Sequence, residues 1–546
     1  MDLAPSPLRL DPVTTEILGS ALSSIAEEMG ETLVRASYST NIKERRDCSV
    51  ALFDLRGNTL CQAEHVPMHL GSFLEMIPHI MRRHPVEEMR PQDVFIGNDA
   101  YEGGGTHLPD LVLAEPIFVD GRMVAWAVNT AHHSDFADRG HAHIYQEGLR
   151  IPPIRLYREG VLQKDVQDLI LLNCQVPRER LSDLRAQMAA NRVGRERVTA
   201  LCHRYGVEVV LAAGDALQDY AERKMRAGIA AIPDGTYRFA DVYENPEIEE
   251  PMDFSVEITV AGDEMRLHFE APPQVRAGLN MTHTALLAVV YYAVKAAVDP
   301  TILPNAGLAR PLTVTAREAS VVSCRHPAAV NGRTSTCQRV VDIILGALAQ
   351  AIPLQVTAAG NGACAVGSFT GQGKDGKLWV YLETIGGGAG ARATKDGLDG
   401  VHVHMTNTSN LPVEALENEY PLTLLRYELV DGSGGPGAHR GGMGLRRVYR
   451  IEEPCRLRVD GSRLRSDPYG LQGGLFGGRA AFDFGGATMS QGRGGLEAGM
   501  IVEIRTAGGG GYGPPAERTS EEVAADIREG RITPTRAAEV YGPRAA

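Results

Sequence analysis

The first hydrophobic pattern of the chain is that of an amphipathic surface helix. Asp11 is a suitable N-cap, Pro12 fits the first helical position, and apolar residues recur at helical spacing from Ile17 to Leu33. The same spacing returns in four later stretches, residues 72–83, 178–225, 285–298 and 336–351. Helices are therefore expected at intervals along the first two thirds of the chain.

Short apolar runs bounded by turn residues predict strands between these helices. The clearest runs are Leu111 to Val119 and Arg122 to Ala131, which flank Asp120-Gly121, a preferred two-residue hairpin turn. A shorter hairpin is expected over residues 48–63, and a second strand region begins near Tyr237. The N-terminal part therefore combines helices with antiparallel hairpins.

The pattern changes after Pro353, where glycine pairs and triplets separate short strand candidates. Such spacing suits turns and close backbone approaches in a β-rich region. A chain of 546 residues is too long for one ordinary core, and roughly two to four domains are expected. We therefore predict a multi-domain α+β protein. Its parts are a mixed α/β N-terminal domain with the hairpin (1–230), an α+β middle domain (231–355) and a glycine-rich, β-heavy C-terminal domain (356–546).

Composition and charge exclude several classes of protein. The net charge is −13, which does not favour electrostatic binding of nucleic acid. The longest apolar run, Ala285 to Val294, is too short to cross a bilayer, and no secretory signal is visible at the start. The eight cysteines include no C-x-x-C pair and fit a reducing compartment. We expect a cytoplasmic protein with neither a nucleic-acid nor a membrane partner.

Histidines concentrate in the N-terminal region, where nine of the 16 lie within residues 65–143. The sequence H-L-P-D at residues 107–110 leads into the first strand of the clear hairpin, and H-H-S-D at residues 132–135 follows the second. If the two-residue turn is as predicted, Asp110 lies opposite Ala131, and the two clusters meet within ~5–8 Å at the open end of the hairpin. Imidazoles and carboxylates at such a place suit a divalent metal.

Ideal hairpin register leaves the choice between His132 and His133 open. Strict alternation puts His133 on the face of Asp110, whereas a bulge or a loop exit puts His132 there. Asp47 is a candidate fourth ligand because it leads into an apolar strand; alternatively it forms a salt bridge with one of the two arginines before it. The alternative for the whole cluster is that its residues cap loops by hydrogen bonding.

Two other motifs are weaker candidates. His402-Val-His404 could place two imidazoles on one strand face, although an ordinary pair of histidines on a surface strand is favoured. Residues 371–376 match G-x-G-x-x-G, but they lie between strand candidates with no helix to follow, so a hairpin loop is expected. No other phosphate-binding motif occurs, and we expect no ATP site in this chain.

Eleven sequence blocks, in order, carry a resemblance to a known family. They are DPVTTEILGSAL, ERRDCSVALFD, EHVPMHLGSF, NDAYEGGGTHLPD, NTAHHSDF, APPQVRAGLN, TSTCQRVVD, GGGAGARATKDGLDGVHVHMTNTSN, PVEALENEYPL, HRGGMGLRR and AGGGGYGPP. Together they make the chain similar, over essentially its whole length, to the hydantoinase B/oxoprolinase family. That family includes subunits of ATP-dependent hydantoinases and lactamases, the C-terminal half of 5-oxoprolinases, and subunits of acetone and acetophenone carboxylases. One departure is Ala389, which interrupts the glycine-rich block.

The resemblance implies a metal site and a partner. The metal ligands implied by the family are Asp47, His107, Asp110 and His132. This set chooses His132 over His133, and its mixed carboxylate and imidazole character suits Zn²⁺, Mn²⁺ or Fe²⁺. ATP would be bound by a partner subunit, a hydantoinase A-type ATPase with an actin-like fold, in a hetero-oligomer.

The implied reaction is the hydrolysis of a cyclic amide, such as a hydantoin, a lactam or 5-oxoproline. Phosphorylation makes the unreactive amide electrophilic, a metal lowers the pKa of water toward ~7, and Asp135 or His133 is a candidate to shuttle the proton. The second hypothesis is a subunit of an ATP-dependent ketone carboxylase, for which bicarbonate would be a substrate. The third is a non-catalytic scaffold for the ATPase, in which the histidines are structural.

Overall fold

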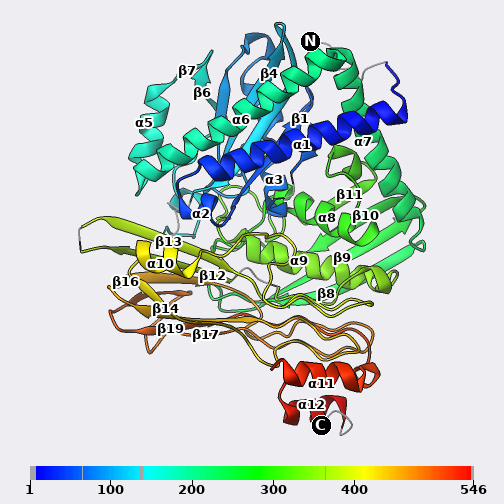
Figure 1. The fold of residues 1–546 in the computed structure, drawn as a ribbon, viewed down its shortest axis with the longest axis vertical. Coiled ribbons are helices and arrows are strands. Elements are labelled where there is room, and N and C mark those ends of the chain that lie inside the picture. Colours follow the sequence, from blue (N-terminus) through cyan, green and yellow to red (C-terminus); the bar gives the residue numbers. More distant parts are fainter. Residues whose placement is uncertain (1–7, 64, 134–138, 363–364, 375, 543–546) are drawn as a thin grey trace.

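The computed structural model describes residues 8–63, 65–133, 139–362, 365–374 and 376–542. Helices and strands are mixed along the chain, and the strands form four main sheets, so the predicted α+β fold class is confirmed (Figure 1). Asp135 lies outside the described residues. No helix of the described chain is long and apolar enough to span a membrane.

A seven-stranded sheet organises the N-terminal part of the chain. Its strand order is β2-β1-β5-β4-β3-β6-β7, with neighbours antiparallel. The strands are β1 (Cys48–Phe53), β2 (Thr59–Gln62), β3 (Val94–Gly97), β4 (Asp110–Val119), β5 (Arg122–His132), β6 (Ile154–Arg158) and β7 (Val161–Leu162). Both hairpins predicted from the sequence are present as β1–β2 and β4–β5.

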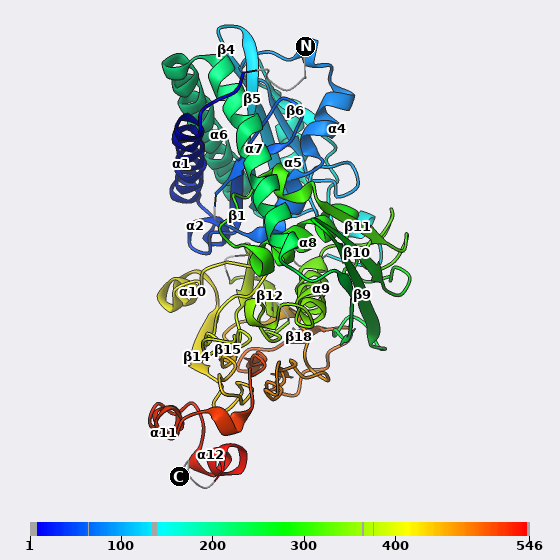
Figure 2. The ribbon, with the colours of Figure 1, turned by 90° about the vertical axis from the view of Figure 1, so that its right-hand side faces the viewer.

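Helices cover both faces of this sheet, which explains why its central strands are buried along their length (Figure 2). The longest helices, α1, α6 and α7, pack on one face, and the short helices α3 and α4 contribute to the core on the other. The Asp11 side chain caps α1 as predicted. The helices of this part are α1 (Pro12–Ala36), α2 (Thr40–Lys43), α3 (Leu70–Phe73), α4 (Met76–Arg83), α5 (Lys164–Leu172), α6 (Pro177–Tyr205) and α7 (Val207–Ala230).

The β4–β5 hairpin contains a bulge that its sequence pattern does not specify. Phe118 pairs with Met123, but the next pair is Ile117 with Ala125, so one residue of β5 is skipped. The shift carries through to the open end, where Asp110 pairs with His132 instead of Ala131. The ideal register assumed above is therefore wrong by one residue.

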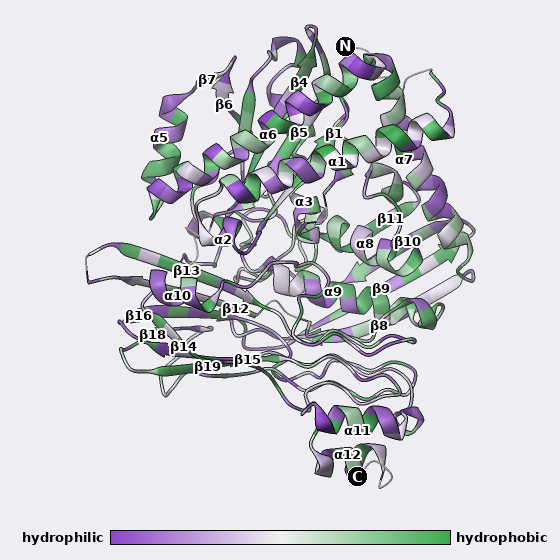
Figure 3. Cartoon of the chain, viewed as in Figure 1, coloured by the Kyte–Doolittle hydropathy of each residue, from purple (hydrophilic) through white to green (hydrophobic). Residues whose placement is uncertain are grey.

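The middle part has a four-stranded sheet in the order β11-β10-β9-β8, packed against α8 and α9. The buried and exposed positions of β9 alternate, as expected for a sheet with one face on the core and one in solvent. Helix α8 is strongly apolar, and α9, which mixes apolar and polar residues, is almost wholly buried (Figure 3). The elements are β8 (Gly235–Tyr243), β9 (Met252–Ala261), β10 (Glu264–Glu270), β11 (Leu312–Ala316), α8 (His283–Val298) and α9 (Arg333–Leu348).

Two more four-stranded sheets, β13-β12-β16-β18 and β14-β15-β19-β17, form the C-terminal part. The strands are β12 (Ala365–Gln372), β13 (Leu378–Ile385), β14 (Leu422–Leu429), β15 (Leu445–Ile451), β16 (Cys455–Asp460), β17 (Ala481–Asp483), β18 (Arg493–Leu496) and β19 (Ile501–Arg505). The helices are α10 (Val413–Glu419), α11 (Ser520–Arg528) and α12 (Pro534–Tyr541). The last two lie at the far end of the molecule from α1 (Figure 1).

Glycine is required where C-terminal segments stack closely. A Cβ atom on Gly388 would lie 2.0 Å from the Gly442 carbonyl oxygen, and one on Gly441 would lie 1.9 Å from the Gly509 carbonyl oxygen. Segments distant in sequence therefore touch backbone to backbone here. The largest hydrophobic core includes Met68, Met252 and Met405, so all three predicted parts of the chain contribute to it. The domain boundaries near residues 230 and 355 stay predictions.

Candidate metal centre

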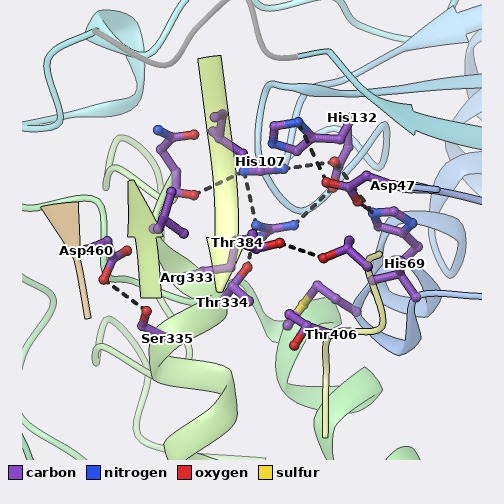
Figure 4. A pocket seen from close by; sticks show the side chains of 18 of the residues that line it. Asp47, His69, His107, His132, Arg333, Thr334, Ser335, Thr384, Thr406 and Asp460 are labelled. Atoms are coloured by element: carbon purple, nitrogen blue, oxygen red, sulfur yellow. Dashed lines mark hydrogen bonds and ion pairs between the residues drawn. The ribbon is translucent and has the colours of Figure 1, made fainter. Parts of the chain in front are cut away.

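Three adjacent strands bring acidic and imidazole side chains into one row. Asp47 directly precedes β1, His132 ends β5 and Asp110 begins β4, and β5 lies between the other two strands. The His132 backbone N–H donates to the Asp47 carbonyl oxygen at 3.0 Å, and His132 pairs in register with Asp110. The side chains of Asp47 and His132 lie close together in Figure 4. The ends of these three neighbouring strands thus hold a carboxylate, an imidazole and a second carboxylate side by side.

His107 completes the cluster from the loop before β4. Its Nε2 atom lies 2.8 Å from Asp110 Oδ1, and its ring centre is 5.0 Å from that of His132. Ligand atoms of these three buried residues all lie within 4.8 Å of one another, which is the spacing needed to share one cation. Asp47 adjoins them, with its Oδ2 4.0 Å from His132 Nδ1.

The protonation of the cluster suits metal binding. Burial, assisted by the nearby Arg333 charge, lowers the pKa of His107 to about 4, and burial also lowers the pKa of His132. Burial alone would raise the pKa of the Asp110 carboxyl, but the imidazoles and the guanidinium around it hold that pKa well below its usual range. Near neutral pH the cluster therefore offers neutral imidazoles and an ionised carboxylate, the forms that bind metals.

Two residues at this centre were not predicted from the sequence. The Nε2 atom of His69, at the end of a short 3-10 turn (Pro67–His69), lies 3.7 Å from carboxylate oxygens of both Asp47 and Asp110. Arg333, at the start of α9, donates to Asp110 Oδ2 at 3.0 Å. His69 belongs to the histidine-rich segment, but no local pattern separates it from its neighbours. Arg333 reaches the centre through tertiary packing alone.

Neighbouring polar groups contact the Nδ1 atoms of the two imidazoles and so orient the rings. His107 Nδ1 lies 3.1 Å from the Asn331 carbonyl oxygen and 3.0 Å from Arg333 Nη1, a group that can only donate a hydrogen bond. The Asn41 side-chain amide donates to the His132 carbonyl oxygen at 2.8 Å and lies 3.2 Å from His132 Nδ1. Such outer contacts fix ring orientation, as they do around metal ligands in general.

The cluster forms one wall of a cavity of about 80 Å³ (Figure 4). This volume has room for an ion and several water molecules, since a water needs roughly 10–15 Å³ on this measure. The opposite walls come from the start of α9, from strands β13 and β16, and from the loop after β13. They contribute Thr334, Ser335, Thr384, Thr406, Thr408, Arg458 and Asp460. The cavity therefore lies where the N-terminal sheet meets the rest of the chain.

His133 faces away from this cavity. Its Nε2 atom lies 3.2 Å from Gln187 Oε1 on α6, it is fully buried there, and it does not line the cavity. This geometry argues against His133 as the proton shuttle.

The histidine pair at residues 402 and 404 is not on a surface strand, contrary to expectation. Both residues follow β13 in a loop, and His404 Nε2 pairs with the buried Asp342 at 3.0 Å.

Comparisons with known proteins agree with the resemblance found in the sequence. The chain is 37% identical to an uncharacterised protein of Methanocaldococcus jannaschii, over 96% of this chain and 94% of the other. It is 30% identical to a protein named caprolactamase subunit beta of Pseudomonas jessenii, over 98% of this chain and 96% of the other.

Two solved structures share the fold. One is the ATP-dependent caprolactamase from Pseudomonas jessenii, with a TM-score of 0.89 and 28% identity over 98% of this chain and 96% of that one. The other is a nucleotide-free acetone carboxylase, with a TM-score of 0.86 over 97% of this chain and 79% of that one; at 19% identity it supports the fold alone. The family model described as hydantoinase B/oxoprolinase matches residues 11–515. The chain therefore belongs to the hydantoinase B/oxoprolinase family.

Proposed function

We propose that this chain is the metal-bearing catalytic subunit of an ATP-dependent cyclic-amide hydrolase. Its substrate would be a hydantoin, a lactam or a 5-oxoproline-type ring that a partner ATPase activates. The single observation that carries the proposal is the buried cluster of His107, Asp110 and His132 with Asp47 beside it, in a cavity. Family membership supports the reaction class, because relatives carry the names oxoprolinase and caprolactamase.

The donor set fits a divalent metal held by Asp47, His107, Asp110 and His132. Two carboxylates and two imidazoles favour Zn²⁺, Mn²⁺ or Fe²⁺ over Ca²⁺ and Mg²⁺, which prefer shells made of oxygen alone. A metal there would act as a Lewis acid on the substrate and would lower the pKa of water toward ~7. The buried, pre-oriented ligands of this chain would hold it in place without reorganisation.

The remaining cavity residues would position the reacting groups. Arg333 holds Asp110 through its ion pair, and His69 faces both carboxylates, so the two acids keep fixed orientations. The hydroxyl-bearing residues on the opposite wall, among them Thr334 and Thr384, can hydrogen-bond a polar ring. With His133 facing α6, the group that carries the proton stays unassigned, and Asp135 remains a candidate on sequence alone.

A partner subunit would supply ATP binding and activation. The phosphate-loop pattern at residues 371–376 begins within β12, where Gln372 pairs with Leu378 of the adjacent antiparallel strand β13. A relative that is similar over nearly its whole length is named as a subunit, which supports an assembly of unlike chains. We infer that the partner is a hydantoinase A-type ATPase with an actin-like fold.

The second candidate is a subunit of an ATP-dependent ketone carboxylase. The likeness in fold to an acetone carboxylase is compatible with this candidate, and the family resemblance in the sequence includes such carboxylases. The two candidates differ in whether bicarbonate is consumed, and they share the metal centre.

One experiment separates the candidates. The chain is co-purified with a hydantoinase A-type ATPase, the proposed partner, and assayed with ATP against a panel of cyclic amides and small ketones, with and without bicarbonate. The hydrolase proposal expects ring opening of a cyclic amide that needs both subunits and no bicarbonate. Bicarbonate-dependent consumption of a ketone would instead establish the carboxylase, and the absence of both activities would leave the scaffold hypothesis.

A further inference from the structure

A second cavity, of about 300 Å³, adjoins the metal cavity on the C-terminal sheet β13-β12-β16-β18. It is formed by one face of β12, β16 and β18. Cross-strand pairing places Ser368 beside Arg458 and Thr370 beside Arg456, and Arg458 in turn pairs with Arg493 of β18. Because side chains alternate along a strand, all five project from one face.

The two cavities share a wall. Arg458 lines both of them. Two residues further along the same strands, Val366 and Asp460 pair with each other and line the metal cavity. The sheet face therefore runs from the metal centre to the second cavity without interruption. At the outer end of this face Arg456 and Ser490 are exposed, so the second cavity opens to solvent.

The lining of the second cavity is cationic. It contains three arginines, Arg456, Arg458 and Arg493, and no acidic residue. Glu247 compensates part of this charge from behind: its Oε1 accepts from Arg458 Nη2 at 2.8 Å and lies 3.8 Å from Arg493 Nη2. Arg456 makes no ion pair and no side-chain hydrogen bond with the described part of the chain. Its guanidinium is available to a ligand.

The same cavity also contains a buried hydroxyl group that lacks a hydrogen-bond partner. Ser368 is 2% exposed and lines the cavity, yet its Oγ atom has no hydrogen-bond partner among the described residues. Buried polar groups are almost always paired, so an unpaired one at a cavity wall requires an explanation. A hydroxyl beside several guanidiniums is complementary to an oxyanion, which accepts from both.

We propose that this cavity binds an oxyanion of the phosphate class. Guanidinium forks match phosphate oxygens in geometry and charge, and the Ser368 and Thr370 hydroxyls supply further donors. The phosphate could belong to an activated substrate on its way to the metal cavity or be free inorganic phosphate on its way out. Binding itself is independent of the proposed function, whereas its role in substrate delivery rests on that function.

Binding is tested by titrating the isolated full-length chain with inorganic phosphate at low ionic strength, in a calorimeter. The wild type is expected to bind at one saturable site. Arg456→Gln is expected to weaken binding ~10-fold, because it removes a charge-assisted hydrogen bond donor. Ser368→Ala tests the buried hydroxyl and should weaken binding several-fold. Arg426→Gln, which alters an exposed arginine outside this cavity, is the matched control and should leave affinity unchanged.

Further arms identify the source and separate the two proposals. Methyl phosphate binding at least as tightly as phosphate would favour a phosphorylated substrate; binding of free phosphate only would favour the released product. His107→Ala should retain phosphate binding, so failure of the metal assignment does not mask this result. No saturable binding by the wild type, or equal weakening by Arg456→Gln and Arg426→Gln, would overturn the proposal.

Discussion

Glu147 shows how one buried carboxyl can make stability depend on pH. Its Oε1 atom accepts from the Val330 and Asn331 backbone N–H groups at 2.8 and 2.7 Å, but Oε2 is buried without a partner among the described residues. Burial raises the pKa of Glu147 from 4.5 to about 8. The folded chain therefore keeps a proton that the unfolded chain releases at lower pH.

The sign of the effect follows from this difference. A raised carboxyl pKa contributes stability below about pH 4.5, and this contribution is lost as pH rises toward about 8. Glu147→Gln removes the titrating group while keeping an acceptor for the two N–H groups. Thermal unfolding at several pH values in this range should show the wild type losing stability relative to the variant as pH rises. Parallel pH profiles would contradict the assignment.

Only some of the residues at the candidate metal centre could be predicted from the sequence. The residues of the cluster could be named because they stand at the ends of predicted strands, where neighbouring strands meet. His69 and Arg333 could not, since Arg333 follows Asp110 by more than two hundred residues and meets it only through packing of α9. The hairpin pattern left the choice between His132 and His133 open, and only the family resemblance selected His132.

At the level of elements, the bulge in the β4–β5 hairpin decides which histidine faces the cluster. Pairing skips Val124, a buried residue that packs in the core under α1 and α6. The turn, the two strands and their lengths were predictable from the pattern. The bulge was not, because it depends on how β5 packs against helices distant in sequence.

The register predicts opposite results for two adjacent substitutions. His132→Ala should weaken metal binding by at least ~100-fold because it removes a side chain proposed to bind the metal directly. His133→Gln should leave the metal affinity nearly unchanged because that ring contacts Gln187 instead. Competition against a chromophoric chelator measures both. If His133→Gln lost metal and His132→Ala retained it, the observed register would not describe the working site.

On the scale of the whole molecule, the chain can hold and position a substrate but is not expected to activate it. The described residues include no strand-to-helix phosphate loop, and the one glycine match to such a motif begins within β12, which is followed by a strand and not by a helix. The α+β class and the β-rich C-terminal part could be read from hydrophobic and glycine patterns. The close glycine stacking of Gly388 and Gly441 on distant segments could not, because neither pattern specifies which backbones meet.

Because ATP binding is assigned to the partner subunit, we predict that the purified chain alone does not turn over ATP. A coupled assay for ADP should give no steady rate above background, and the addition of the partner ATPase and a cyclic amide should restore one. The partner alone serves as the control for its own basal rate. Steady ATP hydrolysis by the isolated chain would contradict the assignment of ATP binding to the partner.

Metal content against turnover tests the central claim most directly. Elemental analysis of the active wild-type complex should find close to one divalent transition metal per copy of this chain. His107→Ala should lose both the metal and cyclic-amide turnover while still folding and binding its partner. His268→Ala, at a partly exposed position of β10 outside the cavity, should keep both. Active wild-type complex without stoichiometric metal, or a His107→Ala variant that retains metal and activity, would contradict the account.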